Sequence, residues 1–585
     1  MSLACSLQGA VLSARSLPVS LSPLPTVFTS RKRPAEERER EGNMIRPDHW
    51  YFPEKFILLM DTLAKHLNLK NGADYLVKIL GKSLFSAFLN QKPLKPIIGS
   101  VTATVTGQHK GQPVETQVTS LLGGKQILEA WTTCIQNAQH SIQVALYDFD
   151  NLEMGGGRQP DGADIHPYWQ LQQAMLNSLL AKAREFKTKN QGGKVQLILD
   201  ASKEQAYDAY GNLIEFSPNK KFKINNQEFV DKLRKLAKDE QLPLEILHYP
   251  RELAKLYHVK LLVVDGQQAI IGGMNMSNHS PANWDTCVLL DGPEVANLAQ
   301  ATFYEDWVVG RYYEDKRKGA LFKDISAPGA SDIERYRSEL PPLSERVSNP
   351  GIQILNSTPR EYQPFGFSPR EEVGDYLKKL FADPQLKEIM AEQFVFTHKA
   401  LTENLLKRTK DDTLNARFLH SLGVIQAFPY TRKASHRLYD ANLLRFYKED
   451  EATQEKLHSK LFIFRKKKRQ WEIFIGSPNT SKVGIETNVQ EGLRDDSPVT
   501  NERFQRGNRE VAIVIPSNKL AEPFEKQFEI DWKHSEPPTM ASETQEAWNN
   551  PNTLVGAHER VAHLMPQLGS FADARKHLPN LIATA

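Results

Sequence analysis

A β-hairpin that opens with a histidine and a lysine occurs twice in this chain of 585 residues. The first copy is "HVKLLVVDGQQAIIGGMN" (258–275), and the second is "HSKLFIFRKKKRQWEIFIGSPN" (458–479). Each copy contains an apolar run, a polar turn, an apolar return strand and Gly-Gly or Gly-Ser shortly before an asparagine. Side chains two positions apart on a strand share a face, so the histidine and lysine of each copy point the same way. The repeat predicts two equivalent units in one chain.

The apolar run in each copy occupies both faces of its strand, which is typical of a strand buried on both sides. A lysine on such a strand is costly to bury unless it has a partner. Two buried His-x-Lys pairs followed by matching glycines and asparagines therefore indicate a functional site, and a packing role alone does not explain them. The site candidates are His258, Lys260, Asn275, His458, Lys460 and Asn479.

Strand and helix patterns alternate on both sides of each hairpin, which predicts an α/β fold. In the first copy we expect an amphipathic helix before a strand over 141–149, a helix over 168–190, and strands over 194–200 and 243–250. In the second copy we expect a helix over 370–390, and strands over 392–399 and 423–430. The segments 293–315 and 518–534 are the expected closing helices of the two units.

The predicted organisation has two core-forming units and several extensions, as the chain length suggests. Residues 44–117 are expected to be helical, with 56–89 forming two amphipathic helices that either cover the core or lie on a membrane surface. The boundaries that we predict are an extension 1–43, the helical region 44–117, a first half 118–312, a linker 313–349, a second half 350–535 and a tail 536–585.

The composition excludes several classes of protein. The net charge of +4, from 74 basic and 70 acidic residues, gives no support for nucleic-acid binding. Three cysteines rule out a disulfide framework, and the 16 histidines show no metal-site spacing, so we expect no metal or other cofactor. No uncharged apolar stretch is long enough to predict a membrane span.

The N-terminal 35 residues contain serines and four basic residues but no acidic residue, a composition that resembles an organelle transit peptide. The alternative is a disordered or misassigned start, with Met44 as the first residue. The expected location is cytoplasmic or peripheral to a membrane, with organelle targeting if the extension is a transit peptide.

The paired residues predict chemistry on a phosphodiester if the two halves pack about a pseudo-twofold axis. Two lysines and two asparagines would then supply cationic and amide groups to a tetrahedral oxyanion. One neutral histidine could attack phosphorus, and the other, protonated, could protonate the leaving oxygen and later activate water or an alcohol. Each histidine also needs an acceptor for its far ring nitrogen. Asp285 and Glu510, each at the start of a buried strand, are the predicted acceptors, with Glu486 as the alternative in the second half.

These motifs resemble those of the phospholipase D superfamily, in which His-x-Lys-x4-Asp is followed by Gly-Gly/Ser-x-Asn. The first copy matches in full, with Asp265 as the aspartate, whereas Arg465 occupies that position in the second copy. The resemblance covers about Leu121 to Trp532 and is strongest to bacterial phospholipase D and cardiolipin synthase-like proteins. It implies two pseudo-twofold-related α/β/α halves around one shared active-site cleft. It also implies that His258 is the nucleophile, that His458 is the acid and base, and that Asp265 supports the hairpin.

The function that we expect is a metal-independent phosphodiesterase or phosphatidyltransferase that acts on phospholipid through a phosphohistidine. The basic segment 465–470 at the second hairpin tip could contact an anionic surface or could be a solvated loop. A nuclease of the same superfamily is the alternative, which the balanced charge disfavours without excluding nucleic acid. A catalytically inactive scaffold is a third reading, against which both intact His/Lys pairs stand. The head group and the acceptor alcohol are not specified by the sequence.

Overall fold

The computed structural model describes most of the chain between residues 97 and 535. The described ranges are 97–109, 112–149, 169–189, 192–201, 226–250, 253–254, 256–277, 280–317, 328–338, 340, 351–421, 435, 437–439, 441–447, 455–467, 470–487 and 507–535. The expected extension, the amphipathic helices over 56–89, the strand over 423–430 and the tail lie outside these ranges.

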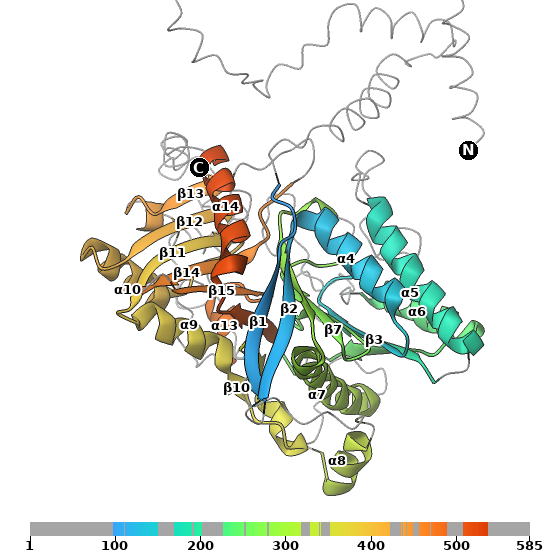
Figure 1. The fold of residues 1–585 in the computed structure, drawn as a ribbon. Coiled ribbons are helices and arrows are strands. Elements are labelled where there is room, and N and C mark those ends of the chain that lie inside the picture. Colours follow the sequence, from blue (N-terminus) through green and yellow to red (C-terminus); the bar gives the residue numbers. More distant parts are fainter. Residues whose placement is uncertain are drawn as a thin grey trace, which may run out of the picture. The chain divides into compact units, whose positions relative to one another are not determined.

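The described part of the chain forms two eight-stranded sheets with the same plan (Figure 1). The strand order of the first sheet is β1-β2-β8-β7-β6-β3-β4-β5, and that of the second is β10-β9-β16-β15-β14-β11-β12-β13. The two orders correspond position by position, and in both sheets the His-x-Lys hairpin (β6–β7 or β14–β15) lies at the centre. This repetition confirms the α/β, two-halved fold that the sequence predicts.

The helices and strands of the first half and of the connection after it have these bounds: β1 (Thr102–His109), β2 (Gln112–Leu122), α4 (Gly123–Asn137), β3 (Ser141–Leu146), α5 (Trp169–Lys189), β4 (Lys194–Asp200), α6 (Gln227–Asp239), β5 (Leu244–Tyr249), β6 (Lys260–Val264), β7 (Gln268–Gly272), η2 (Ser280–Ala282), β8 (Thr286–Asp291), α7 (Pro293–Arg317) and α8 (Ala330–Arg337). Those of the second half are β9 (Gln353–Thr358), η3 (Arg360–Phe365), β10 (Arg370–Glu371), α9 (Glu372–Ala382), β11 (Leu386–Gln393), α10 (Lys399–Lys410), β12 (Asn415–Ser421), β13 (Leu444–Tyr447), β14 (Lys460–Lys466), β15 (Gln470–Gly476), α13 (Lys482–Ile485), β16 (Glu510–Ile515) and α14 (Asn518–His534).

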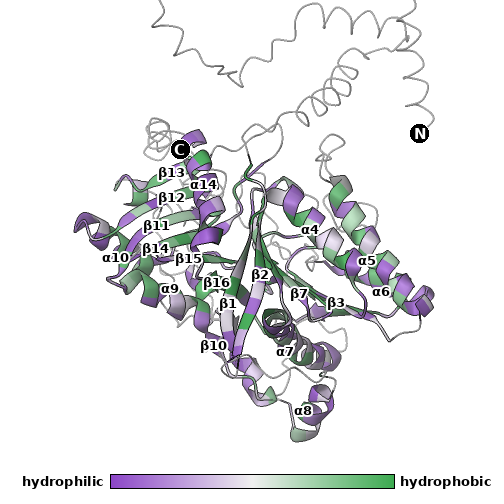
Figure 2. Ribbon diagram, viewed as in Figure 1, coloured by the Kyte–Doolittle hydropathy of each residue, from purple (hydrophilic) through white to green (hydrophobic). Residues whose placement is uncertain are grey.

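Both faces of each central strand are covered, which explains why the sequence there is apolar without alternation. In β6, Leu261 and Val263 face a core that is shared with α7, α14 and the second sheet, whereas Leu262 and Val264 face α4, α5 and α6. The second sheet has its own outer core against α9 and α10. Figure 2 shows the hydrophobic residues in green on the sheet strands and more hydrophilic residues in purple on α8. The closing helices α7 and α14 pack in the core that contains strands of both sheets, so they lie in the layer between the sheets.

The hairpin turn of the first copy has the conformation that its sequence predicts. Asp265 and Gly266 both adopt positive φ angles, of 55° and 63°, as a turn with an Asp-Gly sequence favours. The strands themselves begin at Lys260 and Lys460, so each histidine lies just before its strand and not within it.

Four expectations about local structure are wrong. Residues 102–109 and 112–117, expected to be helical, belong to the antiparallel strands β1 and β2, where many residues are β-branched. The first sheet thus begins before residue 118. The helix expected over 370–390 ends at Ala382, because Pro384 interrupts it. The strand expected over 392–399 lies earlier, at Leu386–Gln393, and is buried, and α10 begins at Lys399. Lastly, α7 extends to Arg317, and α8 lies within the expected linker.

No helix among the described residues combines the length and the apolar character needed to cross a bilayer.

Candidate active site

Main-chain hydrogen bonds join the two halves at the histidine of each His-x-Lys motif. The N–H of His258 donates to the carbonyl oxygen of Arg509 at 2.9 Å, and the N–H of His458 donates to that of Trp284 at 2.9 Å. In return, the N–H groups of Arg509 and Trp284 donate to Leu256 and Lys456, respectively. The two histidines are therefore fixed by backbone that belongs to the opposite half.

The side-chain contacts of the histidines cross between the halves in the same way. Nδ1–H of His258 donates to Oε2 of Glu510 at 2.9 Å, and Nδ1–H of His458 donates to Oδ2 of Asp285 at 2.6 Å. Both carboxylates are fully buried. The alternative acceptor Glu486 lies elsewhere, where it pairs with His398 and Lys378. An acceptor on Nδ1 selects the tautomer in which Nε2 carries the lone pair.

Burial disfavours the charged form of both histidines. It lowers the pKa of His258 to about 4, while the Glu510 carboxylate acts in the opposite direction. Burial likewise lowers the pKa of His458 to about 4, with Lys460 contributing in the same direction and Asp285 opposing it. In the free protein, both rings are thus neutral near pH 7.

The two lysines are buried beside the histidines. Nζ of Lys260 donates to the main-chain oxygen of His258 at 2.8 Å, and Nζ of Lys460 donates to that of His458. Nζ of Lys460 is also 3.0 Å from Nε2 of His458. Burial lowers the pKa of Lys260 to about 7 and that of Lys460 to about 8. Both ammonium groups therefore titrate near neutral pH.

An aromatic ring packs against each His/Lys pair, a feature that the sequence reasoning missed. The ring of Tyr147 lies 5.1 Å from that of His258, and Nζ of Lys260 is 5.3 Å from its centroid. Phe394 holds the equivalent place in the second half, 4.6 Å from His458. Each aromatic residue directly follows the strand that pairs with the His-x-Lys strand, which is β3 in the first half and β11 in the second. Their positions at the ends of these two strands could have identified them from the sequence.

Asn275 and Asn479 follow the return strands in equivalent positions. The Oδ1 atom of each is buried and accepts no hydrogen bond from the described residues. A buried polar atom without an internal partner is the condition expected of a group that binds a substrate. Oδ1 of Asn508, whose amide nitrogen donates to Glu510, is in the same condition.

Asp265 and Arg465 anchor the two hairpin tips by different means. The Asp265 carboxylate accepts the main-chain N–H groups of Gln139, His140 and Ser141, each at 2.7 Å. Arg465 instead forms an ion pair with Glu388 on β11, with Nε 2.6 Å from Oε2. In both halves the hairpin tip is thus tied to the strand that pairs with it or to the segment just before that strand.

A buried ion pair lies behind the site and also joins the halves. Nε of Arg509 donates to Oδ1 of Asp306 on α7 at 2.7 Å, and both side chains are at most 1% exposed. The hydroxyls of Tyr257 and Tyr362 donate to the same carboxylate. Because Arg509 precedes Glu510, this network fixes the segment that supplies the acceptor of His258. No motif in the sequence predicts that Asp306 and Arg509 are in contact.

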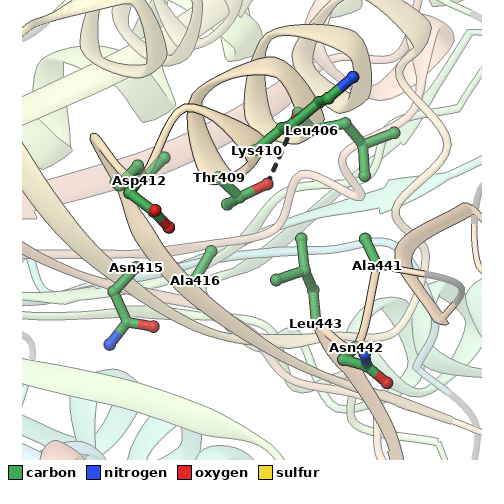
Figure 3. Close-up of a pocket in the computed structure, with 10 residues that line it drawn as sticks. Leu406, Thr409, Lys410, Asp412, Asn415, Ala416, Ala441, Asn442 and Leu443 are labelled. Carbon is green, nitrogen blue, oxygen red and sulfur yellow. Dashed lines mark hydrogen bonds between the residues drawn. The ribbon is translucent and has the colours of Figure 1, made fainter.

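The pocket shown in Figure 3 is separate from these residues. It has a volume of about 700 Å³ and is lined by the end of α10, the start of β12 and the turn before β13, including Thr409, Asn415 and Asn442. None of the histidines, lysines or carboxylates of the site lines it. Among the described residues, no three His, Cys, Asp or Glu side chains are grouped so that they could hold a metal ion.

Residues 132–307 match the family described as "Cardiolipin synthase, PLD-like domain". No curated protein sequence matches the chain. Among solved structures, phosphatidylserine synthase of Haemophilus influenzae Rd KW20 shares 14% identity and a TM-score of 0.45, covering 79% of this chain and 95% of its own. Polyphosphate kinase of Porphyromonas gingivalis shares 11% identity (TM-score 0.37; 72% and 47% covered). The phospholipase D family member Nuc of Salmonella typhimurium shares 14% identity (TM-score 0.21; 33% and 94% covered).

The family match begins in α4, ends in α7 and includes the complete first hairpin with His258, Lys260 and Asp265. Residues 132–307 are thus similar to the PLD-like domain that this family model describes.

Proposed function

We propose that the chain is a metal-independent phosphodiesterase or phosphatidyltransferase of the phospholipase D type, which acts on phospholipids through a phosphohistidine. The observation that carries this proposal is the reciprocal pairing of His258 with Glu510 and of His458 with Asp285. It leaves the lone pair on Nε2 of two neutral imidazoles, beside two lysines. A site with two such histidines can divide a displacement at phosphorus into two steps.

In the first step, Nε2 of His258 attacks phosphorus, and a P–N bond forms as the bond to the leaving oxygen breaks. His458, which is neutral in the free protein, takes up a proton from solvent at Nε2 as the anionic diester binds, and it gives that proton to the leaving oxygen, so the alcohol departs neutral. In the second step, His458 takes a proton from water or an acceptor alcohol, which attacks the phosphohistidine and releases His258. Within the described residues, Nε2 of His258 makes no hydrogen bond, whereas the Lys460 ammonium lies 3.0 Å from both Nε2 and Nδ1 of His458. This difference favours His258 as the nucleophile.

The lysines and asparagines are proposed to bind the phosphate. Lys260 and Lys460 would contact its negatively charged oxygens, and Asn275 and Asn479 would supply amide contacts. The carboxylates Asp285 and Glu510 would orient the rings, and Asp265 would support the first hairpin. A phospholipid substrate implies contact with a membrane surface during turnover.

The experiment that tests this function uses purified protein with two substrates in parallel. We expect head-group release from phospholipid vesicles, loss of release in His258→Ala, and no nicking of supercoiled plasmid. Nicking without head-group release, if it were also lost in His258→Ala, would replace the phospholipid function with the nuclease function. A folded protein that showed neither activity would support the inactive scaffold.

A further inference from the structure

The two orienting carboxylates occupy equivalent places but differ in length and in neighbours. The pairing of Gly272 with Cys287, and of Gly476 with Ala512, sets Asp285 and Glu510 in register with each other. Glutamate has one more rotatable bond than aspartate. Its carboxylate therefore needs an additional restraint to present one oxygen to a ring nitrogen.

Ser477 supplies such a restraint in the second half. Its Oγ–H donates to Oε2 of Glu510 at 2.5 Å, the same oxygen that accepts from His258, and the carbonyl oxygen of Val511, at 3.1 Å, is the more distant alternative acceptor. Its Oγ also accepts the N–H of Val511 at 3.0 Å. Nδ2 of Asn508 donates to the other oxygen, Oε1, at 3.0 Å. Ser477 is fully buried, so these contacts are shielded from bulk solvent. Both carboxylate oxygens are thus fixed by neutral donors.

Gly273 occupies the place of Ser477 in the first half, where the restraint takes another form. A Cβ atom at Gly273 would lie 2.3 Å from Oδ1 of Asp285, so no side chain fits there. Oδ1 instead accepts the N–H of Thr286 at 3.0 Å, and Oδ2 accepts from His458. The shorter side chain, that of Asp285, therefore lies beside a glycine. The longer side chain, that of Glu510, lies beside the hydroxyl of Ser477.

We propose that Ser477 is a positioning residue that holds Glu510 in the orientation that keeps His258 in its Nδ1–H tautomer. That tautomer leaves the Nε2 lone pair to attack phosphorus. The role of Ser477 in the reaction rests on the proposed function, but its effect on the tautomer does not. The positioning role predicts that Ser477 affects the rate at which the phosphohistidine forms, because that step uses His258. It also predicts that Ser477 does not affect hydrolysis of the phosphohistidine, because that step uses His458.

The first test needs no substrate. The full chain is labelled with ¹⁵N-histidine, and the ring signals of His258 are assigned by their loss in His258→Gln. We expect a single Nδ1–H tautomer in the wild type and a mixture of tautomers in Ser477→Ala. Ser459→Ala is the matched control, since Oγ of Ser459 contacts Thr286 and no carboxylate. It removes a buried hydroxyl at the same junction and should leave the His258 signals unchanged.

The second test measures the two steps separately with a nitrophenyl phosphodiester. In Ser477→Ala, the initial release of nitrophenolate should slow about 10- to 100-fold, as for other groups that orient a reacting ligand, while hydrolysis of the adduct keeps its rate. Ser477→Cys keeps the volume but donates weakly, and it should show the same split if Ser477→Ala does not fold. The pair Ser477→Gly with Glu510→Asp reproduces the arrangement of the first half and should recover part of the loss.

A single His258 tautomer in folded Ser477→Ala or Ser477→Cys would overturn the positioning role, and so would equal slowing of both steps. The wild type could instead form no adduct and release no head group, while Ser477→Ala shows a mixture of His258 tautomers. This result would support the positioning role and refute the proposed function.

Discussion

Nδ1 of His258 lies 2.9 Å from a carboxylate oxygen of Glu510, a residue of the other half of the chain. The corresponding pair, His458 and Asp285, crosses in the opposite direction at 2.6 Å. Each half therefore supplies one histidine and the acceptor for the other histidine. The predictions below follow from this exchange and from the burial of the groups around it.

The exchange predicts different losses for the two carboxylates. Glu510→Gln should slow formation of the phosphohistidine by about 10²-fold or more, because His258 loses the acceptor that sets its tautomer. Asp285→Asn should still form the adduct from a nitrophenyl diester and should slow its hydrolysis, because His458 is then impaired. Quenched-flow measurement of nitrophenolate, followed by intact-protein mass, separates the two. The reverse pattern would mean that His458 is the nucleophile and His258 the acid and base.

The two histidines should also differ in whether they can carry the adduct. His458→Ala should form a phosphohistidine from an activated diester, since nitrophenolate departs without a proton, and should then stall for want of a base. His258→Ala should form none. Intact-protein mass at mildly alkaline pH, where the adduct survives, is the measurement. An adduct on His258→Ala that mapped to His458 would exchange the two roles.

The pKa values set the pH range of activity on an activated diester. Below a pH of about 4, His258 becomes protonated and loses its lone pair, and above about 7 to 8 the two lysines lose their charge. We expect kcat/KM to be highest between these limits. Lys260→Arg, whose guanidinium keeps its charge, should move the alkaline decline toward higher pH. If Lys260→Arg keeps activity and leaves the decline in place, the decline does not come from Lys260.

The same histidine pKa values predict how stability depends on pH. Both are lowered from the ordinary value of 6.5 to about 4, so between these limits the unfolded chain binds more protons than the folded chain. The free energy of unfolding should therefore fall as the pH is lowered from 6.5 to about 4. The Tm of His258→Gln combined with His458→Gln should depend less on pH in this window. An equal dependence would assign the acid sensitivity to other groups.

Arg465 tests the departure of the second hairpin from the superfamily motif. Arg465→Asp should leave turnover intact, because Arg465 pairs with Glu388 and contacts neither histidine. It should lower stability by roughly 1 kcal/mol, since two carboxylates then face each other at a partly exposed site. Adding Glu388→Gln, which removes one of the two like charges, should restore part of the Tm. Loss of turnover in folded Arg465→Asp would make Arg465 a substrate contact.

The buried ion pair between Arg509 and Asp306 should contribute more to stability than the pair between Arg465 and Glu388. Asp306→Ala leaves the Arg509 guanidinium without its charged partner and should cost about 3–5 kcal/mol in the free energy of unfolding. Replacing both with Asp306→Leu and Arg509→Met should cost less than Asp306→Ala alone. Chemical denaturation of the three variants measures this. If the double variant were the least stable, the pair would be a net source of stability and not only of alignment.

The sequence predicted the repeat, the α/β class and the central hairpins because their signals are local. The His-x-Lys spacing, the Asp265-Gly266 turn and the apolar runs each lie within a few residues. Asp285 and Glu510 could be chosen as acceptors from their place before buried strands. Which histidine each one serves could not be read, because that depends on how the halves pack. The same holds for Asp306 and Arg509, and for the contact between Ser477 and Glu510. The β1–β2 ribbon was missed because the preceding amphipathic pattern was extended past its end.

The exchanged acceptors have a consequence for how the molecule comes into being. A ribosome makes the half with His258 and Asp285 well before Glu510 and His458 exist. Until the second half is synthesised and docks, His258 has no carboxylate to fix its ring, and Asp285 has no ring to fix. Nascent chains and truncated products that stop before residue 510 therefore contain an intact superfamily motif but lack the group that orients its histidine. Under the proposed function, His258 would therefore become reactive toward phosphodiesters only after the second half has been synthesised and has docked.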